Sequence, residues 1–173
     1  MIDVEPFRKI FQESLWALLQ NWSTWCDDDE LRALHIGFDS SNTEISISLL
    51  TDREPHLAEQ GIDPFQQRIP PWAVGDWRLN RINATYRHGW PDAALLLDWM
   101  EENSRTLEDS EIDKMNADLK KMFFEVATEK ETQRILAHFK RTATPLRIRV
   151  AWFFDDVPFD SQLHFFAKDK NAR

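Results

Sequence analysis

Apolar side chains near the start of the chain recur every three or four residues. This spacing places them along one side of a helix from Val4 to about Trp22, with polar residues on the other side. Four adjacent acids, Asp27, Asp28, Asp29 and Glu30, come next. Because neighbouring like charges repel and favour water, we expect this run to end the helix and to lie in solvent.

The pattern then changes to strict alternation of apolar and polar positions. Leu34 to Phe38 and Ile45 to Leu49 each alternate, and the turn-forming residues 39–42 separate them. Two such stretches around a polar turn predict a β-hairpin. One face of that hairpin is apolar, whereas the other is mostly small and polar.

Residues 51–73 contain four prolines and follow no regular period, so we expect a long loop that wraps the domain. A third strand is predicted over residues 75–82, where Trp77 and Leu79 alternate with polar residues.

Helical spacing returns after this strand. Pro91, at a position that suits the first turn of a helix, opens a helix predicted over residues 91–103, and a second begins near Glu108. Thr128 and Glu131 fit a capping box, so we expect a third helix from there to about residue 140.

The clearest strand of the chain is predicted over residues 146–154, and its later half is apolar on both faces. The residues beyond it are expected to fray. Together these elements predict one α+β domain over residues 1–173, with about four strands in a mostly antiparallel sheet and helices mainly on one face.

The net charge of the chain limits the kinds of molecule that we expect it to bind. The chain has 30 acids and 21 bases, a formal net charge of −9. This balance disfavours nucleic-acid binding, which needs clustered Lys and Arg, but it permits a basic protein partner. A single cysteine, a charged N-terminal segment and the lack of a long apolar run lead us to expect a cytoplasmic protein without a disulfide or membrane association.

Known catalytic and ligand-binding patterns are not found. The five histidines do not form a ligand pair, the four glycines cannot build a phosphate-binding loop, and Cys26 precedes four acids that would raise its pKa. We therefore predict no metal site, no cofactor and no catalytic residue.

One basic and aromatic stretch, residues 77–90, stands out in the acidic chain. It suggests an alternative function, a small-ligand or enzyme site near residues 51–90 in which basic and aromatic side chains bind an anion. The other interpretation is that the arginine stems only cover the outer face of the sheet. The residues of this candidate ligand site are Arg78, Tyr86, His88, Arg147 and Arg149.

The stretches LHIGFDSSNTEISISLL and AVGDWRLNRI resemble bacterial domain-of-unknown-function proteins found among the immunity proteins of polymorphic toxin systems. The resemblance covers about half the chain and supplies no catalytic residues. It implies a small acidic cytoplasmic protein that binds and blocks a toxin without chemistry of its own.

The leading hypothesis is therefore a non-catalytic binding protein, of the immunity type, whose acids steer a basic partner. Its partner-binding acids are predicted to be Asp27, Asp28, Asp29 and Glu30, with Asp155 and Asp156 as a second group. A homo-oligomer that uses exposed tryptophans is a further alternative, and the oligomeric state is left open.

Overall fold

Helices and a mixed β-sheet build the protein, so the predicted α+β class is confirmed. The computed structural model describes residues 3–26, 29–40, 44–52, 79–82, 94–139, 141–152 and 159–163. The elements are α1 (Glu5–Trp25), β1 (Glu30–Asp39), β2 (Glu44–Thr51), β3 (Leu79–Ile82), α3 (Ala94–Thr106), α4 (Asp109–Thr128), α5 (Lys130–Leu136), β4 (Arg141–Trp152) and β5 (Phe159–Leu163).

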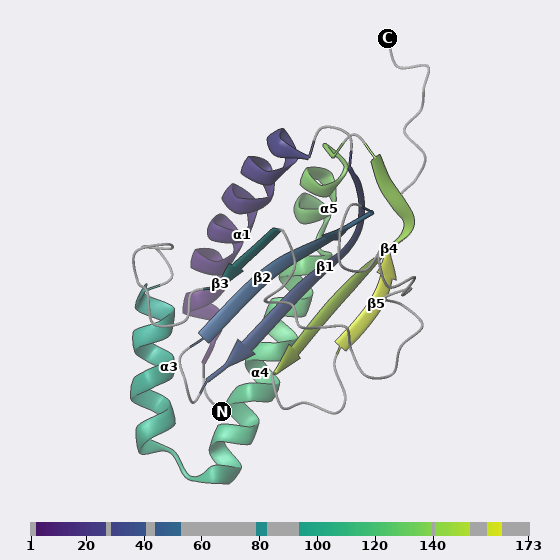
Figure 1. Ribbon diagram of the computed structural model, residues 1–173. Coiled ribbons are helices and arrows are strands. Elements are labelled where there is room, and N and C mark those ends of the chain that lie inside the picture. Colours follow the sequence, from purple (N-terminus) through teal and green to yellow (C-terminus); the bar gives the residue numbers. More distant parts are fainter. Residues whose placement is uncertain are drawn as a thin grey trace.

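The sheet has the strand order β3-β2-β1-β4-β5 (Figure 1). The β1–β2 hairpin forms as predicted, and its antiparallel register pairs His35 with Ser48 and Ile36 with Ile47. β3 and β5 are antiparallel to their neighbours, whereas β1 and β4 are parallel. The sheet thus has five strands where about four were expected, with a parallel pair at its centre. The prediction of one domain over the whole chain stays a prediction.

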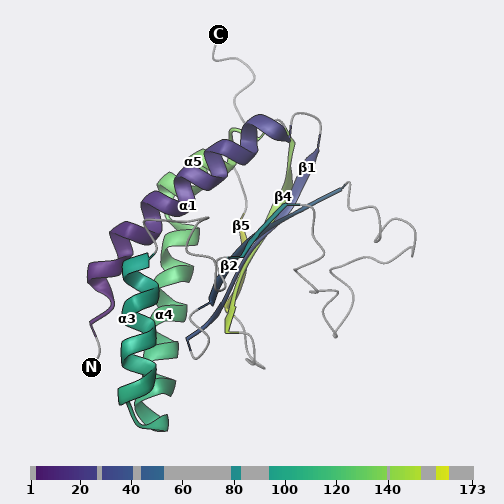
Figure 2. The same ribbon diagram turned by 60° about the vertical axis from the view of Figure 1, so that its left-hand side comes forward.

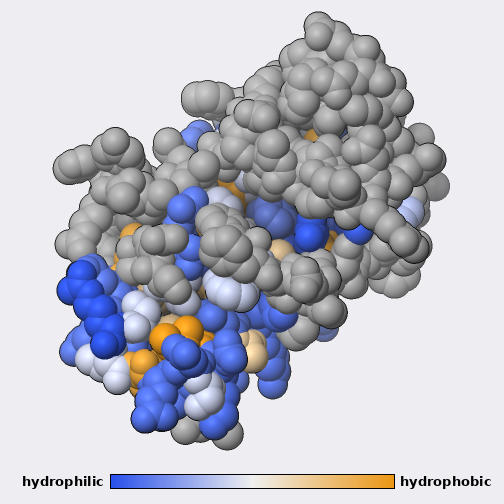
Figure 3. All heavy atoms as spheres, turned by 60° about the horizontal axis from the view of Figure 1, so that its bottom comes forward, coloured by the Kyte–Doolittle hydropathy of each residue, from blue (hydrophilic) through white to orange (hydrophobic). Residues whose placement is uncertain are grey.

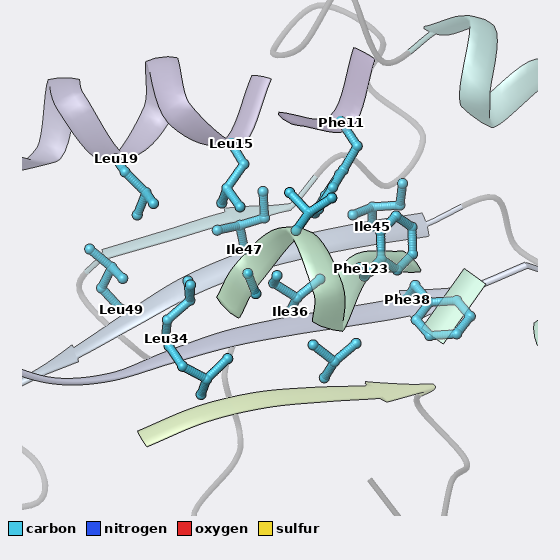
Figure 4. Close-up of a cluster of buried hydrophobic side chains, with 14 of the residues drawn as sticks. Phe11, Leu15, Leu19, Leu34, Ile36, Phe38, Ile45, Ile47, Leu49 and Phe123 are labelled. Carbon is cyan, nitrogen blue, oxygen red and sulfur yellow. The ribbon is translucent and has the colours of Figure 1, made fainter. Parts of the chain in front are cut away.

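All the helices that the structure describes lie on one face of this sheet (Figure 2). Alternate residues of β1, β2 and β4 point toward them, among them Leu34, Ile36, Ile47 and Ile148, and all four are fully buried. Figure 4 shows Leu15 and Leu19 of α1 above these strand residues. The core is therefore a single apolar layer between the helices and one side of the sheet.

Several element boundaries differ from the predictions. The Thr128 hydroxyl donates to the carbonyl of Phe124 at 2.8 Å inside α4, so the predicted capping box is wrong. Instead, extended backbone at Glu129 separates α4 from α5, which ends at Leu136 rather than near residue 140. β4 begins before Pro145, because a register irregularity in its pairing with β1 accommodates a residue that has no N–H.

Thr132 of α5 links its helix to α1 and α4 through its buried hydroxyl. The hydroxyl accepts a hydrogen bond from the indole Nε1 of Trp16 at 2.9 Å and donates to the carbonyl of Val126 at 2.7 Å. Thr132→Val keeps the shape but removes the acceptor of the Trp16 indole and one of the two donors to the Val126 carbonyl, so we expect the free energy of unfolding to fall by about 1–3 kcal/mol. Urea denaturation measures this loss. Thr132→Ser, which keeps the hydroxyl, should lose clearly less, and an equal loss in both variants would contradict the role of the hydrogen bonds.

Candidate functional site

The acids that the sequence proposes for partner binding are only partly described. Asp27, Asp28, Asp155 and Asp156 lie outside the described residues, so their role stays a prediction. Asp29 is only 3% exposed, contrary to the expectation of a solvated charge run, and therefore cannot present its carboxylate on the surface.

The burial of Asp29 follows from the way β1 begins. Glu30, which is half-buried, donates its backbone N–H to Oδ1 of Asp52 at 2.8 Å and accepts the backbone N–H of Asp52 at 3.1 Å. These two bonds close the open end of the β1–β2 hairpin, so Asp29 and Glu30 belong to the fold rather than to a surface tail.

The alternative ligand site is also only partly visible. Arg78, Tyr86 and His88 lie outside the part of the chain that the structure describes, whereas Arg147 and Arg149 are half-buried on β4. In the register of the parallel pair, Arg149 lies beside His35. Because Ile148 and Val150 face the helices, the two arginines occupy the opposite face of the sheet, as predicted.

A row of polar residues crosses this second face. His35 lies between Arg149 on β4 and Ser48 on β2, and the backbone register pairs Ser48 with Asn80 on β3 and Arg149 with Asp160 on β5. His35 is 5% exposed and Ser48 is fully buried. Burial, with the positive charge of Arg149 as a second cause, lowers the pKa of His35 from 6.5 to about 3.

This polar row is better explained by a role in fixing the register of the strands than by a role in an open binding site. A slip of β1 by one residue would put Ile36 in the row and would move His35 into the apolar core, away from Arg149 and Ser48. The row could not be predicted from the sequence, because its members come together only through the pairing of separate strands.

Two carboxylates face each other at the other end of the same hairpin. Asp39 and Glu44 are a cross-strand pair, and Asp39 is buried. Burial of Glu44, followed by the negative charge of Asp39, raises the pKa of Glu44. Next to this pair, the hydroxyl of Ser40 donates to Oδ1 of Asn116 at 2.6 Å and ties the hairpin turn to α4.

Within the described part of the chain, exposed acidic side chains gather where α3 meets α4. Residues 98–113 contain seven acids and one base, a formal charge of −6 within a chain of −9. Six of the acids are exposed and Glu101 is half-buried in an ion pair with Arg105. We call this segment the acidic hairpin; its acids are Asp98, Glu101, Glu102, Glu108, Asp109, Glu111 and Asp113.

The acidic hairpin projects beyond the ends of the strands (Figures 1 and 2). Figure 3 looks at this end of the molecule and shows a mainly hydrophilic surface with smaller hydrophobic areas in it. Leu107, in the turn, and Ile112, in the first part of α4, are only partly buried there. Carboxylates of Glu102, Asp109 and Asp113 make no ion pair or hydrogen bond with the described residues.

Metal binding and membrane insertion find no support in the described ranges. Among those residues, no group of three or more His, Cys, Asp or Glu side chains could hold a metal ion. None of the helices described combines the length and the apolar character that crossing a membrane requires. Comparison with known protein families, curated proteins and solved structures finds no match for this chain.

Proposed function

We propose that this chain is a non-catalytic binding protein that holds a basic protein partner on its acidic hairpin. One observation carries the proposal: a formal charge of −6 lies on 16 consecutive residues of a helical hairpin that projects from the rest of the fold. A field of one sign on a protruding element attracts an oppositely charged partner from a distance and orients it on approach.

Apolar side chains supply the short-range part of the interaction. Leu107 and Ile112 lie among the acids and keep part of their surface in water. Interfaces commonly place such residues at the centre and charged residues at the rim. A partner with basic residues around an apolar anchor therefore fits this end of the molecule better than a uniformly charged polymer such as RNA or DNA, which is itself negative.

The sequence resemblance to immunity proteins of toxin systems agrees with this proposal. An immunity protein acts by occupying its toxin, so it requires a steering surface and no catalytic group. A cytoplasmic location belongs to the same proposal. The direct test is whether the chain forms a stoichiometric complex with a basic toxin encoded by the adjacent reading frame and abolishes its activity.

The charge requirement can be tested without that partner. The triple variant Glu102→Gln, Asp109→Asn and Asp113→Asn removes three exposed carboxylates that make no ion pair or hydrogen bond with the described residues. With a basic amphipathic helical peptide as probe, we expect association to slow about tenfold at low salt and to depend less on salt. Stopped-flow fluorescence at several ionic strengths measures both effects.

A variant with the same net charge is the control. Asp27→Asn, Asp28→Asn and Asp156→Asn neutralise three of the acids that the sequence analysis proposes as the partner surface. We expect this variant to bind the peptide nearly as fast as the unmodified protein. If both triple variants slowed association equally, net charge rather than the acidic hairpin would control binding, and the proposed site would be wrong.

A further inference from the structure

A hollow of about 300 Å³ lies between the start of α1 and the second half of α4. Its apolar lining includes Val4, which is 9% exposed, and Met122, which is 1% exposed. This volume is at the lower end of the range of ligand pockets, and it has room for a side chain rather than for a large cofactor. Asp118, which lines the hollow, is five residues, or about 7.5 Å along the helix axis, beyond Asp113 of the acidic hairpin.

Charged residues of both signs line the hollow, but its two cations are already paired. Arg8 donates to Oε2 of Glu5 at 2.9 Å and also contacts Glu125, and these two carboxylates raise the pKa of Arg8. Lys121 Nζ lies 3.9 Å from Oε1 of Glu125. Neither of the two cations that line the hollow is therefore available to bind an incoming anion.

Two further carboxylates line the hollow without a cationic partner. Asp118 is half-buried and makes no ion pair or hydrogen bond with the described residues. Asp3 accepts only the backbone N–H of Glu5, at 3.1 Å. With four acids and two bases, the lining has a formal charge of −2, and an incoming cation would reduce this excess.

We propose that this hollow receives an arginine side chain of the basic partner. The proposal rests on the proposed function and names one specific contact within it. The guanidinium lies between the carboxylates of Asp118 and Asp3, and the aliphatic stem lies over Val4 and Met122.

Arginine fits this hollow better than lysine for two reasons. A guanidinium is planar and weakly hydrated, so it tolerates the apolar floor, and its several N–H donors reach two carboxylates at once. Arg8 shows the same chemistry at the edge of the hollow, where one guanidinium contacts both Glu5 and Glu125. An ammonium group is compact and more strongly hydrated, and it gains less from such a site.

Short peptides that carry one arginine, one lysine or one citrulline test the proposal on the intact protein. Citrulline has nearly the shape of arginine but no charge. Titration followed by NMR should shift the backbone amide signals of Val4 and Met122 most strongly with the arginine peptide, weakly with the lysine peptide and hardly at all with citrulline. Equal shifts with arginine and citrulline would overturn the proposal.

Two substitutions on α4 give effects of opposite sign. Asp118→Asn removes the carboxylate without a partner and should weaken arginine binding about fivefold, whereas Lys121→Ala removes a competing cation and should strengthen it by up to about fivefold. Glu13→Gln, an exposed position on α1 outside both the hollow and the acidic hairpin, is the matched control and should change affinity little. Stronger binding in Asp118→Asn and weaker binding in Lys121→Ala would indicate an anion site and would contradict the proposal.

The same variants separate this proposal from the proposed function. Suppose that the hairpin triple variant slows binding of the basic helical peptide while Asp118→Asn leaves the preference for arginine over citrulline intact. That result would support the acidic hairpin as the binding surface and would contradict the arginine site in the hollow. If the hairpin triple variant has no effect, the proposed function fails whatever the hollow binds.

Discussion

Replacing Phe123 by alanine is expected to lower the free energy of unfolding by about 3–5 kcal/mol, which is a large part of the stability of a domain of this size. Phe123 of α4 is fully buried between two layers. Its ring centroid lies 4.5 Å from that of Phe11 on α1 and 5.3 Å from that of Phe38 on β1 (Figure 4). Truncation would remove contacts to the helices and to the sheet. It would also leave a cavity that the backbone of neither layer can close.

Chemical denaturation followed by tryptophan fluorescence measures this loss. Phe123→Leu retains most of the side-chain volume and should lose about 1–2 kcal/mol. Phe124→Ala, at the next and only half-buried position of α4, is a control for the general cost of losing a phenyl ring. If Phe123→Ala lost no more stability than Phe124→Ala, the three-ring contact would not hold the layers together.

The elements that sequence analysis predicted best are those with a long, regular period. The apolar spacing of α1 and α4 and the alternation in the β1–β2 hairpin are local properties, because each side chain reaches the core through the geometry of its own element. The helices end where backbone hydrogen bonds change partner, and this depends on tertiary contacts. Thr128 and Glu129 are examples, because the predicted cap residue bonds inside the preceding helix instead.

Non-local pairing could not be predicted from the sequence. The strand β5 is short, and Asp160, Ser161 and Gln162 give it little apolar signal, so it forms as an antiparallel neighbour of β4 rather than from local preference. The parallel pairing of β1 with β4 joins residues more than 100 positions apart, and the described residues between them include the helices α3, α4 and α5. Period alone gives no information on which strands become neighbours.

The proposed binding surface was missed in the sequence for a different reason. Sequence analysis favoured runs of adjacent acids, and one member, Asp29, is buried in the structure. The acids of the acidic hairpin are spread over the end of one helix and the start of the next, so no adjacent run marks them. A count of charge over a window of about four helical turns, rather than over neighbours, would have found the segment.

The largest pH effect is expected from His35. With a pKa of about 3 in the folded protein and 6.5 when exposed, its imidazole stays neutral in the fold across the range in which the unfolded chain binds a proton. Between these two values the unfolded state binds more protons at this position, so acidification favours unfolding. Above pH 7, His35 should therefore contribute nothing to the pH dependence of the free energy of unfolding. Once the pH falls well below 6.5, it should lower this free energy by about 1.4 kcal/mol per pH unit.

Other groups also respond to acid, so the effect is read from a difference between two proteins. Glu44 has the opposite sign, because its pKa is raised in the fold and its protonation favours the folded state. Urea denaturation at several pH values between 7 and 4, on the unmodified protein and on His35→Gln, isolates the contribution of His35. The difference in unfolding free energy between the two should shrink steadily as the pH falls. A constant difference, or an imidazole NMR signal that titrates near pH 6.5 in the folded protein, would show that His35 is not held neutral by burial beside Arg149.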